Sequence, residues 1–396
     1  MQVEANTTGL LDRLEVEPEP EVAASRRRIT LRGVARGTCR GIASGSEWLF
    51  GVLSLLLGLS ILAALPVLQL LSLGYLLESS GRVARTGRLR DGLIGVRRSA
   101  RVGGVVVGTW LALVPPWLVG SFAVSAELID PGGPVAKGWR VALAVVTVLA
   151  AFHIAAAWAR GGQLRHFLWP LGHPVWLYRK LRQGGLYVES RDGLWTYAAT
   201  LRLPYYFRIG LIGFLGTLAW IIPPALLIGA GQRFPLVGVL GALMLAVVVS
   251  FLPFLQVRFA VEGRASAFFA PRAVRDRFRR APWAFAFSLL VMLLASVPLY
   301  LLKVEMIPRE AAWLPSLVFV AFLAPARLLI GWAYARSGRR DLPRHWTLRL
   351  LGRLAIILIA PFYVLVVVLA QYTSWGGVWS LYEQHAFLLP VPFLNM

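Results

Sequence analysis

Long stretches without a single Asp, Glu, Lys or Arg limit the fold of this chain more than any other feature. A membrane-spanning helix needs about 20 mostly apolar residues, and backbone polar groups in hydrocarbon must bond within the protein. The uncharged runs are too long for membrane strands of about 10 residues. They lie between Glu47 and Glu78, Arg101 and Glu127, Arg140 and Arg160, Arg208 and Arg233, Arg233 and Arg258, Arg280 and Lys303, and Arg353 and Glu383, and a further run from Ala311 to Ala335 is interrupted only by Arg327.

The fold predicted from these runs is an all-α, polytopic transmembrane helical bundle with seven full spans and one ambiguous segment. Composition agrees, because 57% of the 396 residues are apolar and only 15% are charged, unlike a soluble domain. We divide the chain into a disordered acidic, then Arg-rich tail (1–45), a transmembrane domain (46–373) and an aromatic C-terminal tail (374–396).

The placement of the positive charges predicts the orientation in the membrane. Arginines crowd the loops at 82–101, 160–208, 258–280 and 336–353, whereas alternate loops are short and poor in them. The positive-inside rule then puts the Arg-rich loops in the cytoplasm and the C-terminus outside. The 41 basic residues against 19 acidic ones are thus explained without nucleic acid. The preference for arginine over lysine indicates a bacterial protein, and hence an inner membrane.

The ambiguous segment is the apolar run from Trp48 to Leu77, which has arginines on both sides. As one straight helix it would measure about 45 Å, more than the hydrocarbon core of about 30 Å. Pro66 lies near its middle and removes a backbone donor. We expect a re-entrant or tight helical hairpin with the N-terminus inside; the alternative is a single span with the N-terminus outside.

Two parts of the chain align as an internal repeat, which predicts a duplicated helical-hairpin unit. Each contains Arg-Asp-Gly-Leu, then Gly-Thr, then Pro-Pro. The first copy is Arg90–Leu93, Gly108-Thr109 and Pro115-Pro116, and the second is Arg191–Leu194, Gly216-Thr217 and Pro223-Pro224. The proline pairs are expected to kink or break their helices, and broken helices in repeated halves are typical of transporter sites. Coincidence in a Gly- and Pro-rich chain is the alternative.

Residues 264–282 predict an amphipathic helix in the headgroup layer. Phe268, Phe269, Val274 and Phe278 share one side of it. The arginines around them are the predicted contacts to anionic lipid headgroups: Arg272, Arg275, Arg279 and Arg280. The stretch at 161–206 has a similar interfacial composition.

Ionisable residues inside spans are functional candidates by default, and two stand out. His153 is expected to be neutral and bonded to a neighbouring helix, with proton or ligand handling as the alternative. Arg327 contacts an anion or lipid phosphate, or else snorkels to the cytoplasmic end of its span. The acids Glu47, Glu78, Glu127, Glu262 and Glu305 all fall at predicted span ends. Motifs for catalysis, metal or phosphate loops are absent, so we expect no cofactor and no metal.

The chain also resembles a domain-of-unknown-function family of prokaryotic polytopic membrane proteins. The resemblance rests on Gly74-Tyr75-Leu76-Leu77, on Asp91-Gly92-Leu93 after several arginines, and on Phe259-Ala260-Val261-Glu262-Gly263. It implies an all-helical membrane domain and assigns no catalytic residue.

Two functions follow as hypotheses. The first is a non-enzymatic membrane component that organises lipids or a membrane-protein partner through its basic face. The second is a small-solute or lipid transporter, in which the proline pairs and Arg327 line a polar path.

Overall fold

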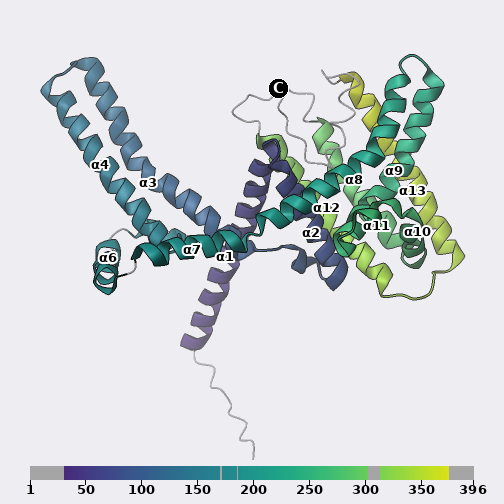
Figure 1. The fold of residues 1–396 in the computed structure, drawn as a ribbon, viewed down its shortest axis with the longest axis horizontal. Coiled ribbons are helices and arrows are strands. Elements are labelled where there is room, and N and C mark those ends of the chain that lie inside the picture. Colours follow the sequence, from purple (N-terminus) through teal and green to yellow (C-terminus); the bar gives the residue numbers. More distant parts are fainter. Residues whose placement is uncertain (1–30, 170–171, 185, 302–312, 374–396) are drawn as a thin grey trace, which may run out of the picture. The chain divides into compact units, whose positions relative to one another are not determined.

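The computed structural model describes residues 31–169, 172–184, 186–301 and 313–373 (Figure 1). Within these ranges it contains helices and no strand, which confirms the predicted all-α bundle. The helices are α1 (Leu31–Ala64), α2 (Gln69–Thr86), η1 (Leu89–Gly92), α3 (Val96–Ile129), α4 (Pro134–Ala159), α5 (Leu164–Leu168), α6 (Gly172–Gln183), α7 (Leu186–Thr200), α8 (Leu203–Ala230), α9 (Pro235–Glu262), η2 (Ala265–Phe269), α10 (Pro271–Arg280), α11 (Pro282–Leu301), α12 (Trp313–Gly338) and α13 (Trp346–Thr373).

The chain divides into two compact units, Met1–Ser46 and Glu47–Met396. In the first unit α1 begins at Leu31, so the predicted N-terminal tail is helical from that residue onward. The acidic residues 1–30 and the predicted C-terminal tail, 374–396, lie outside the described residues. All that follows concerns the second unit.

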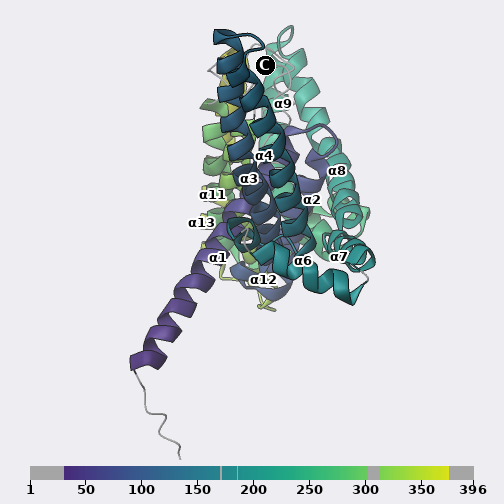
Figure 2. The same ribbon diagram turned by 90° about the vertical axis from the view of Figure 1, so that its left-hand side faces the viewer.

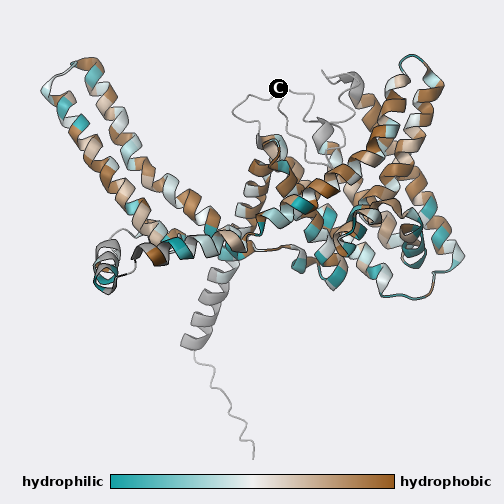
Figure 3. Ribbon diagram, viewed as in Figure 1, coloured by the Kyte–Doolittle hydropathy of each residue, from teal (hydrophilic) through white to brown (hydrophobic). Residues whose placement is uncertain are grey.

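Seven helical segments among the described residues are long and apolar enough to cross a membrane, so the protein is a multi-pass membrane protein (Figure 3). A bent pair, α10 with α11, would make an eighth; its two helices meet at 114°. The seven are Ser44–Ala64, Val96–Ile129, Pro134–Ala159, Arg191–Ala230, Pro235–Glu262, Leu314–Gly338 and Trp346–Ala370. The assignment differs from the prediction, in which the segment at 280–303 was a full span and 48–77 the ambiguous one.

The chain breaks at Pro66, and this separates the ambiguous segment into two helices of different character. α1 ends at Ala64, and Val67 has a φ of 65°, a left-handed conformation that no helix interior contains. The part of α1 within the second unit is long enough to span by itself. On which side of the membrane the N-terminus lies stays a prediction.

α2 is a core helix, with most of its residues buried by other helices. It packs on α8, α9 and α12, and two glycines let it approach α8 closely. Gly74 on α2 faces the backbone of Tyr206 and Gly210, and Gly210 on α8 faces the backbone of Leu70. Small residues at such crossings replace the hydrophobic driving force that helices lack in lipid. The Gly-Tyr-Leu-Leu motif at Gly74 therefore serves packing.

Both copies of the predicted repeat form helical hairpins: α3 pairs with α4, and α8 with α9 (Figures 1 and 2). The predicted helix breaks at the proline pairs are wrong, because α3 runs through Pro115-Pro116 and α8 through Pro223-Pro224. A proline removes one backbone donor, and the bonds of the neighbouring turns hold such a helix together. The Arg-Asp-Gly-Leu tetrapeptides also differ: the first lies in and just after η1, the second inside α7.

Matching contacts nevertheless support the duplication. The glycine of each Gly-Thr pair lies against the ring of a phenylalanine that follows the hairpin, Phe167 over Gly108 and Phe268 over Gly216. The threonine of each pair accepts a hydrogen bond from the second helix of its hairpin. Trp158 Nε1 donates to Thr109 Oγ1 over 3.3 Å, and Gln256 Nε2 donates to Thr217 Oγ1 over 2.7 Å.

The predicted amphipathic helix at 264–282 is shorter and packs on protein. η2 precedes α10, which covers only Pro271–Arg280. Phe268, Val274 and Phe278 are buried in the core of the bundle, whereas Phe269 is exposed. Their apolar face therefore meets neighbouring helices, which offer an apolar surface as good as lipid.

Candidate anion-binding site

A polar pocket of about 480 Å³ lies where α1, α2, η1, α3 and α8 approach one another. Its volume falls within the range of small-ligand sites. Five arginines line it, together with one carboxylate, two tyrosines and a tryptophan: Arg82, Arg90, Arg97, Arg98, Arg202, Glu78, Tyr205, Tyr206 and Trp48. We call this set, with the backbone of 93–96, the basic pocket.

Two helices begin at the basic pocket, and they are the first helices of the two repeats. α3 starts after Gly95 and α8 after Arg202. Both of these N-cap residues have left-handed backbones, and neither start has a side-chain cap. The first amides of a helix lack partners within it and carry partial positive charge, which favours anions.

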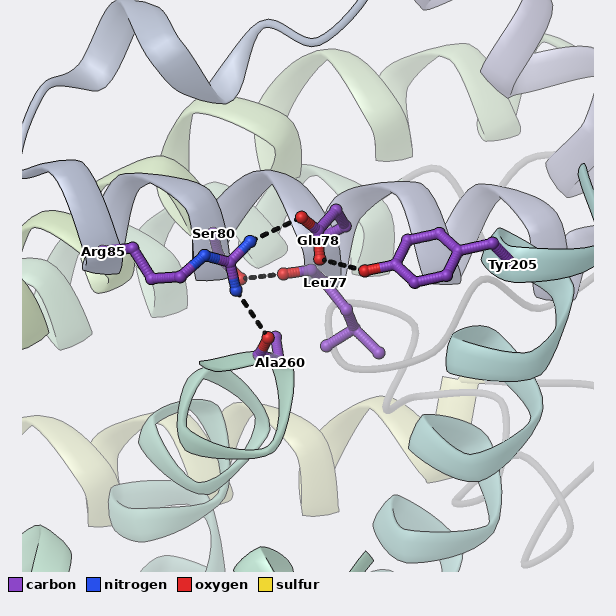
Figure 4. Close-up of polar contacts among 6 residues, drawn as sticks. All are labelled: Leu77, Glu78, Ser80, Arg85, Tyr205 and Ala260. Carbon is purple, nitrogen blue, oxygen red and sulfur yellow. Dashed lines mark hydrogen bonds and ion pairs between the residues drawn. The ribbon is translucent and has the colours of Figure 1, made fainter. Parts of the chain in front are cut away.

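Glu78 anchors one wall of the pocket (Figure 4). Its side chain is 9% exposed and forms an ion pair with Arg85, Oε1 to Nη2 at 2.5 Å. Tyr205 Oη donates to Glu78 Oε2 over 3.0 Å. Arg85 also donates to the carbonyl oxygen of Ala260 over 2.9 Å, which ties α2 to the end of α9. The only acid of the pocket is thus already engaged by a cation outside it.

The arginines of the pocket are not compensated to the same degree. Among the described residues, Arg82, Arg97 and Arg202 form no ion pair within 4.0 Å. Arg98 donates to the neutral carbonyl of Thr200 over 2.7 Å, and Arg90 lies 4.0 Å from Asp91 with 77% of its side chain exposed. The pocket therefore carries a positive excess that an anion would neutralise.

An apolar cavity of about 210 Å³ adjoins the basic pocket. The two share Ile94, Gly95, Arg98 and Tyr206 as lining residues. From there the cavity extends between α1 and α2, along Leu55, Gly58, Leu59, Leu62 and Leu71. A charged compartment thus continues into a hydrocarbon-like one.

Comparisons with protein families, curated proteins and solved structures returned no significant match to this chain. The predicted family resemblance therefore stays a prediction, and the site is interpreted from its own geometry.

Arg327, the first predicted intramembrane residue, lies inside the bundle. It is 3% exposed, so the snorkelling alternative is wrong. Arg327 Nη1 on α12 donates to Gln256 Oε1 on α9 over 3.1 Å, and Gln256 in turn donates to Thr217 on α8. These bonds cross-link three helices, and Arg327 lines neither the basic pocket nor the apolar cavity.

His153 also takes part in packing. Its Nε2 lies 2.9 Å from the carbonyl oxygen of Phe167, the residue that covers Gly108. In the second repeat Trp220 Nε1 donates to the carbonyl of Phe268 over 3.1 Å, so a ring nitrogen holds the phenylalanine backbone in both copies. This contact fits the expected hydrogen bond to a neighbouring element.

The four predicted headgroup arginines surround α10. Arg272 and Arg275 are exposed, whereas Arg279 and Arg280 are half-buried, and Arg279 pairs with Asp276 at 3.4 Å. Arg275, with Arg353, lies on an otherwise mostly apolar groove of about 540 Å³ formed with α9, α11 and α13. Among the described residues, no cluster of three or more His, Cys, Asp or Glu side chains could hold a metal ion.

Glu78 and Gln256 are the polar residues that sequence reasoning missed. Glu78 was placed at the end of a span because the uncharged run stops there, but it lies in the middle of α2 and is buried. Its spacing from Arg82 and Arg85, four and seven residues along, is that of one helix face and could have revealed it. Gln256 carries no charge and did not interrupt its apolar run.

Proposed function

We propose that this protein is a non-enzymatic membrane component that binds anionic lipid in its basic pocket and thereby organises lipid around itself. The observation that carries the proposal is the junction of the five-arginine pocket with the apolar cavity. A lipid has the same two parts in the same order, an anionic headgroup and a hydrocarbon chain. Arginine is also the side chain best suited to phosphate, because its planar fork donates two parallel hydrogen bonds.

The expected orientation supports the same partner. The arginines of the pocket belong to the loops that the positive-inside rule assigns to the cytoplasm. The cytoplasmic leaflet is the one in which anionic lipid gives a negative surface potential, and each well-placed arginine contributes about 1 kcal/mol of attraction. Lipid of that leaflet would reach the pocket without crossing the membrane.

The transporter hypothesis has less support. It needs broken helices and a polar path, but both proline pairs lie in continuous helices. Arg327, its best path residue, contacts Gln256 instead of lining either cavity. A membrane-protein partner remains compatible with the proposal, as a second ligand of the basic face.

Replacing Arg97 by glutamine is expected to lower the affinity for dioleoylphosphatidylglycerol about five- to tenfold, because one charge-assisted contact to phosphate is lost. The measurement is native mass spectrometry of the purified protein with that lipid, and with the zwitterionic dioleoylphosphatidylcholine, at fixed ionic strength. Arg97 is exposed and forms no described ion pair, so the fold should be retained.

The matched control is Arg264→Gln, which removes an exposed arginine that lines neither the basic pocket nor the apolar cavity. It should bind phosphatidylglycerol as the parent does. Equal losses in the two variants would mean that only the overall charge attracts lipid. No preference of the parent for phosphatidylglycerol over phosphatidylcholine would refute the proposed function.

Arg202→Gly is expected to stabilise the protein while weakening lipid binding. Arg202 has φ 51° and ψ 38°, a left-handed conformation that glycine adopts without strain. Relief of that strain, less the stacking of Arg202 on Tyr205 at 4.7 Å, gives a gain of about 0.5–1 kcal/mol. Thermal unfolding and lipid affinity should therefore move in opposite directions. A variant that binds lipid normally would exclude Arg202 from the site.

A further inference from the structure

We infer that the basic pocket selects lipids whose phosphate carries two or more negative charges, that is, phosphate monoesters or diphosphates, over the singly charged phosphodiesters. The inference rests on the proposed function and names the chemical class of its ligand. Three features of the pocket lead to it.

The first feature is the number of uncompensated charges. Glu78 is the only carboxylate that lines the pocket, and Arg85 neutralises it from outside. Arg82, Arg97 and Arg202 form no described ion pair, and Arg98 has only a neutral carbonyl as its described acceptor. A phosphodiester brings one negative charge and would leave most of this excess in place. A phosphate monoester brings nearly two near neutral pH, and a diphosphate more.

The second feature is the direction of the fixed dipoles. α3 and α8 both begin at the pocket, after Gly95 and Arg202, and neither start is capped by a side chain. Two helix starts at one pocket favour a compact, highly charged group over a diffuse one, because the dipole field falls off within the first turn. The terminal phosphate of a monoester presents three acceptor oxygens. A phosphodiester has only two unesterified oxygens.

The third feature is the size of the adjoining cavity. At about 210 Å³ it is smaller than a typical drug-sized site and accommodates a segment of one hydrocarbon chain. Gly58 lies on its wall, and a Cβ added there would meet no atom within 4 Å. A larger side chain at this position would therefore fill the cavity and leave the arginines unchanged. This separates the contribution of the chain from that of the phosphate.

The test compares dioleoylphosphatidic acid, a monoester, with dioleoylphosphatidylglycerol, a diester of the same acyl chains, by native mass spectrometry of the full-length protein at pH 7.5 and pH 5. The second phosphate pKa is about 6, so only phosphatidic acid changes its charge between these conditions. At pH 7.5 phosphatidic acid should bind at least about tenfold more tightly, and at pH 5 the two affinities should agree within about threefold.

Protein groups that titrate affect both lipids and cancel in the ratio. The ionisable groups that face the pocket or its wall are Glu78, Arg82, Arg85, Arg90, Asp91, Arg97, Arg98, Arg202, Tyr205 and Tyr206. The arginines keep their charge at both pH values. The ratio of the two affinities therefore reports the charge of the ligand.

Two further arms separate the remaining explanations. Gly58→Leu should weaken phosphatidic acid about tenfold and leave the competition by inorganic phosphate unchanged; equal effects on both would mean that free phosphate, and not lipid, is the ligand. Equal affinity for the two lipids at pH 7.5 would overturn the inference and leave the proposed function standing. If neither lipid binds better than dioleoylphosphatidylcholine, the proposed function itself fails.

Discussion

Gly210→Leu is expected to prevent assembly of the helical core, and Gly74→Leu should do the same. The two glycines face each other where α2 crosses α8, and an added side chain would meet backbone atoms: those of Leu70 in the first variant, those of Tyr206 in the second. Backbone cannot move aside as a side chain can, so the helices must separate. Overpacking of this kind costs at least about 3 kcal/mol.

Size-exclusion chromatography of the detergent-solubilised protein, with thermal unfolding of any folded fraction, would measure this effect. The control is Gly138→Leu on α4, where an added Cβ has no neighbour within 4 Å. Leucine is the better helix former, so the control should be as stable as the parent. A monodisperse Gly210→Leu protein with unchanged unfolding would show that the α2–α8 crossing does not require glycine.

Gln256→Leu is expected to destabilise the folded protein by about 3 kcal/mol. The change removes the acceptor of a hydrogen bond from the buried Arg327 and the donor to the buried Thr217. A buried charge that loses an acceptor costs more than the net value of the bond it made. Unfolding by heat or by a denaturing detergent, monitored by tryptophan fluorescence, gives the difference from the parent.

The double variant Gln256→Leu/Arg327→Met provides the decisive comparison. Replacing a buried polar pair by apolar residues of similar size is often neutral, so the double variant should recover much of the lost stability. Gln232→Leu, at an exposed glutamine, is the matched control and should have little effect. If the double variant is less stable than Gln256→Leu alone, the charge of Arg327 contributes stability by another route.

The spans could be predicted because uncharged runs report directly on the hydrocarbon that surrounds them. Pro66 was also informative, since a missing donor at that position separates α1 from α2. The proline pairs misled, because a long apolar helix keeps enough of its other bonds to continue through them. His153 and Arg327 were visible as ionisable residues in apolar runs, but their partners, Phe167 and Gln256, were not.

The basic pocket could not be predicted, because its arginines come from segments that are far apart in the chain. Arg82 and Arg97 were recognised only as part of a cytoplasmic loop, and Arg202 as part of another. What brings them together is the close crossing of α2 and α8 at Gly74 and Gly210. The sequence offers those glycines among 38 others and similar small residues, without indicating which pair meets.

The burial of α2 also has a consequence for how the protein is made. α2 packs against α12, where Ser80 meets Gly331, about 250 residues later in the chain. At ribosomal rates of 5–20 residues per second, roughly 10–50 s pass before that neighbour is synthesised. Throughout this interval Glu78 and Arg85 have no complete protein surroundings, and hydrocarbon would not solvate them. The nascent helix must therefore wait at the membrane surface, or beside an insertion factor, until the later spans arrive to enclose it.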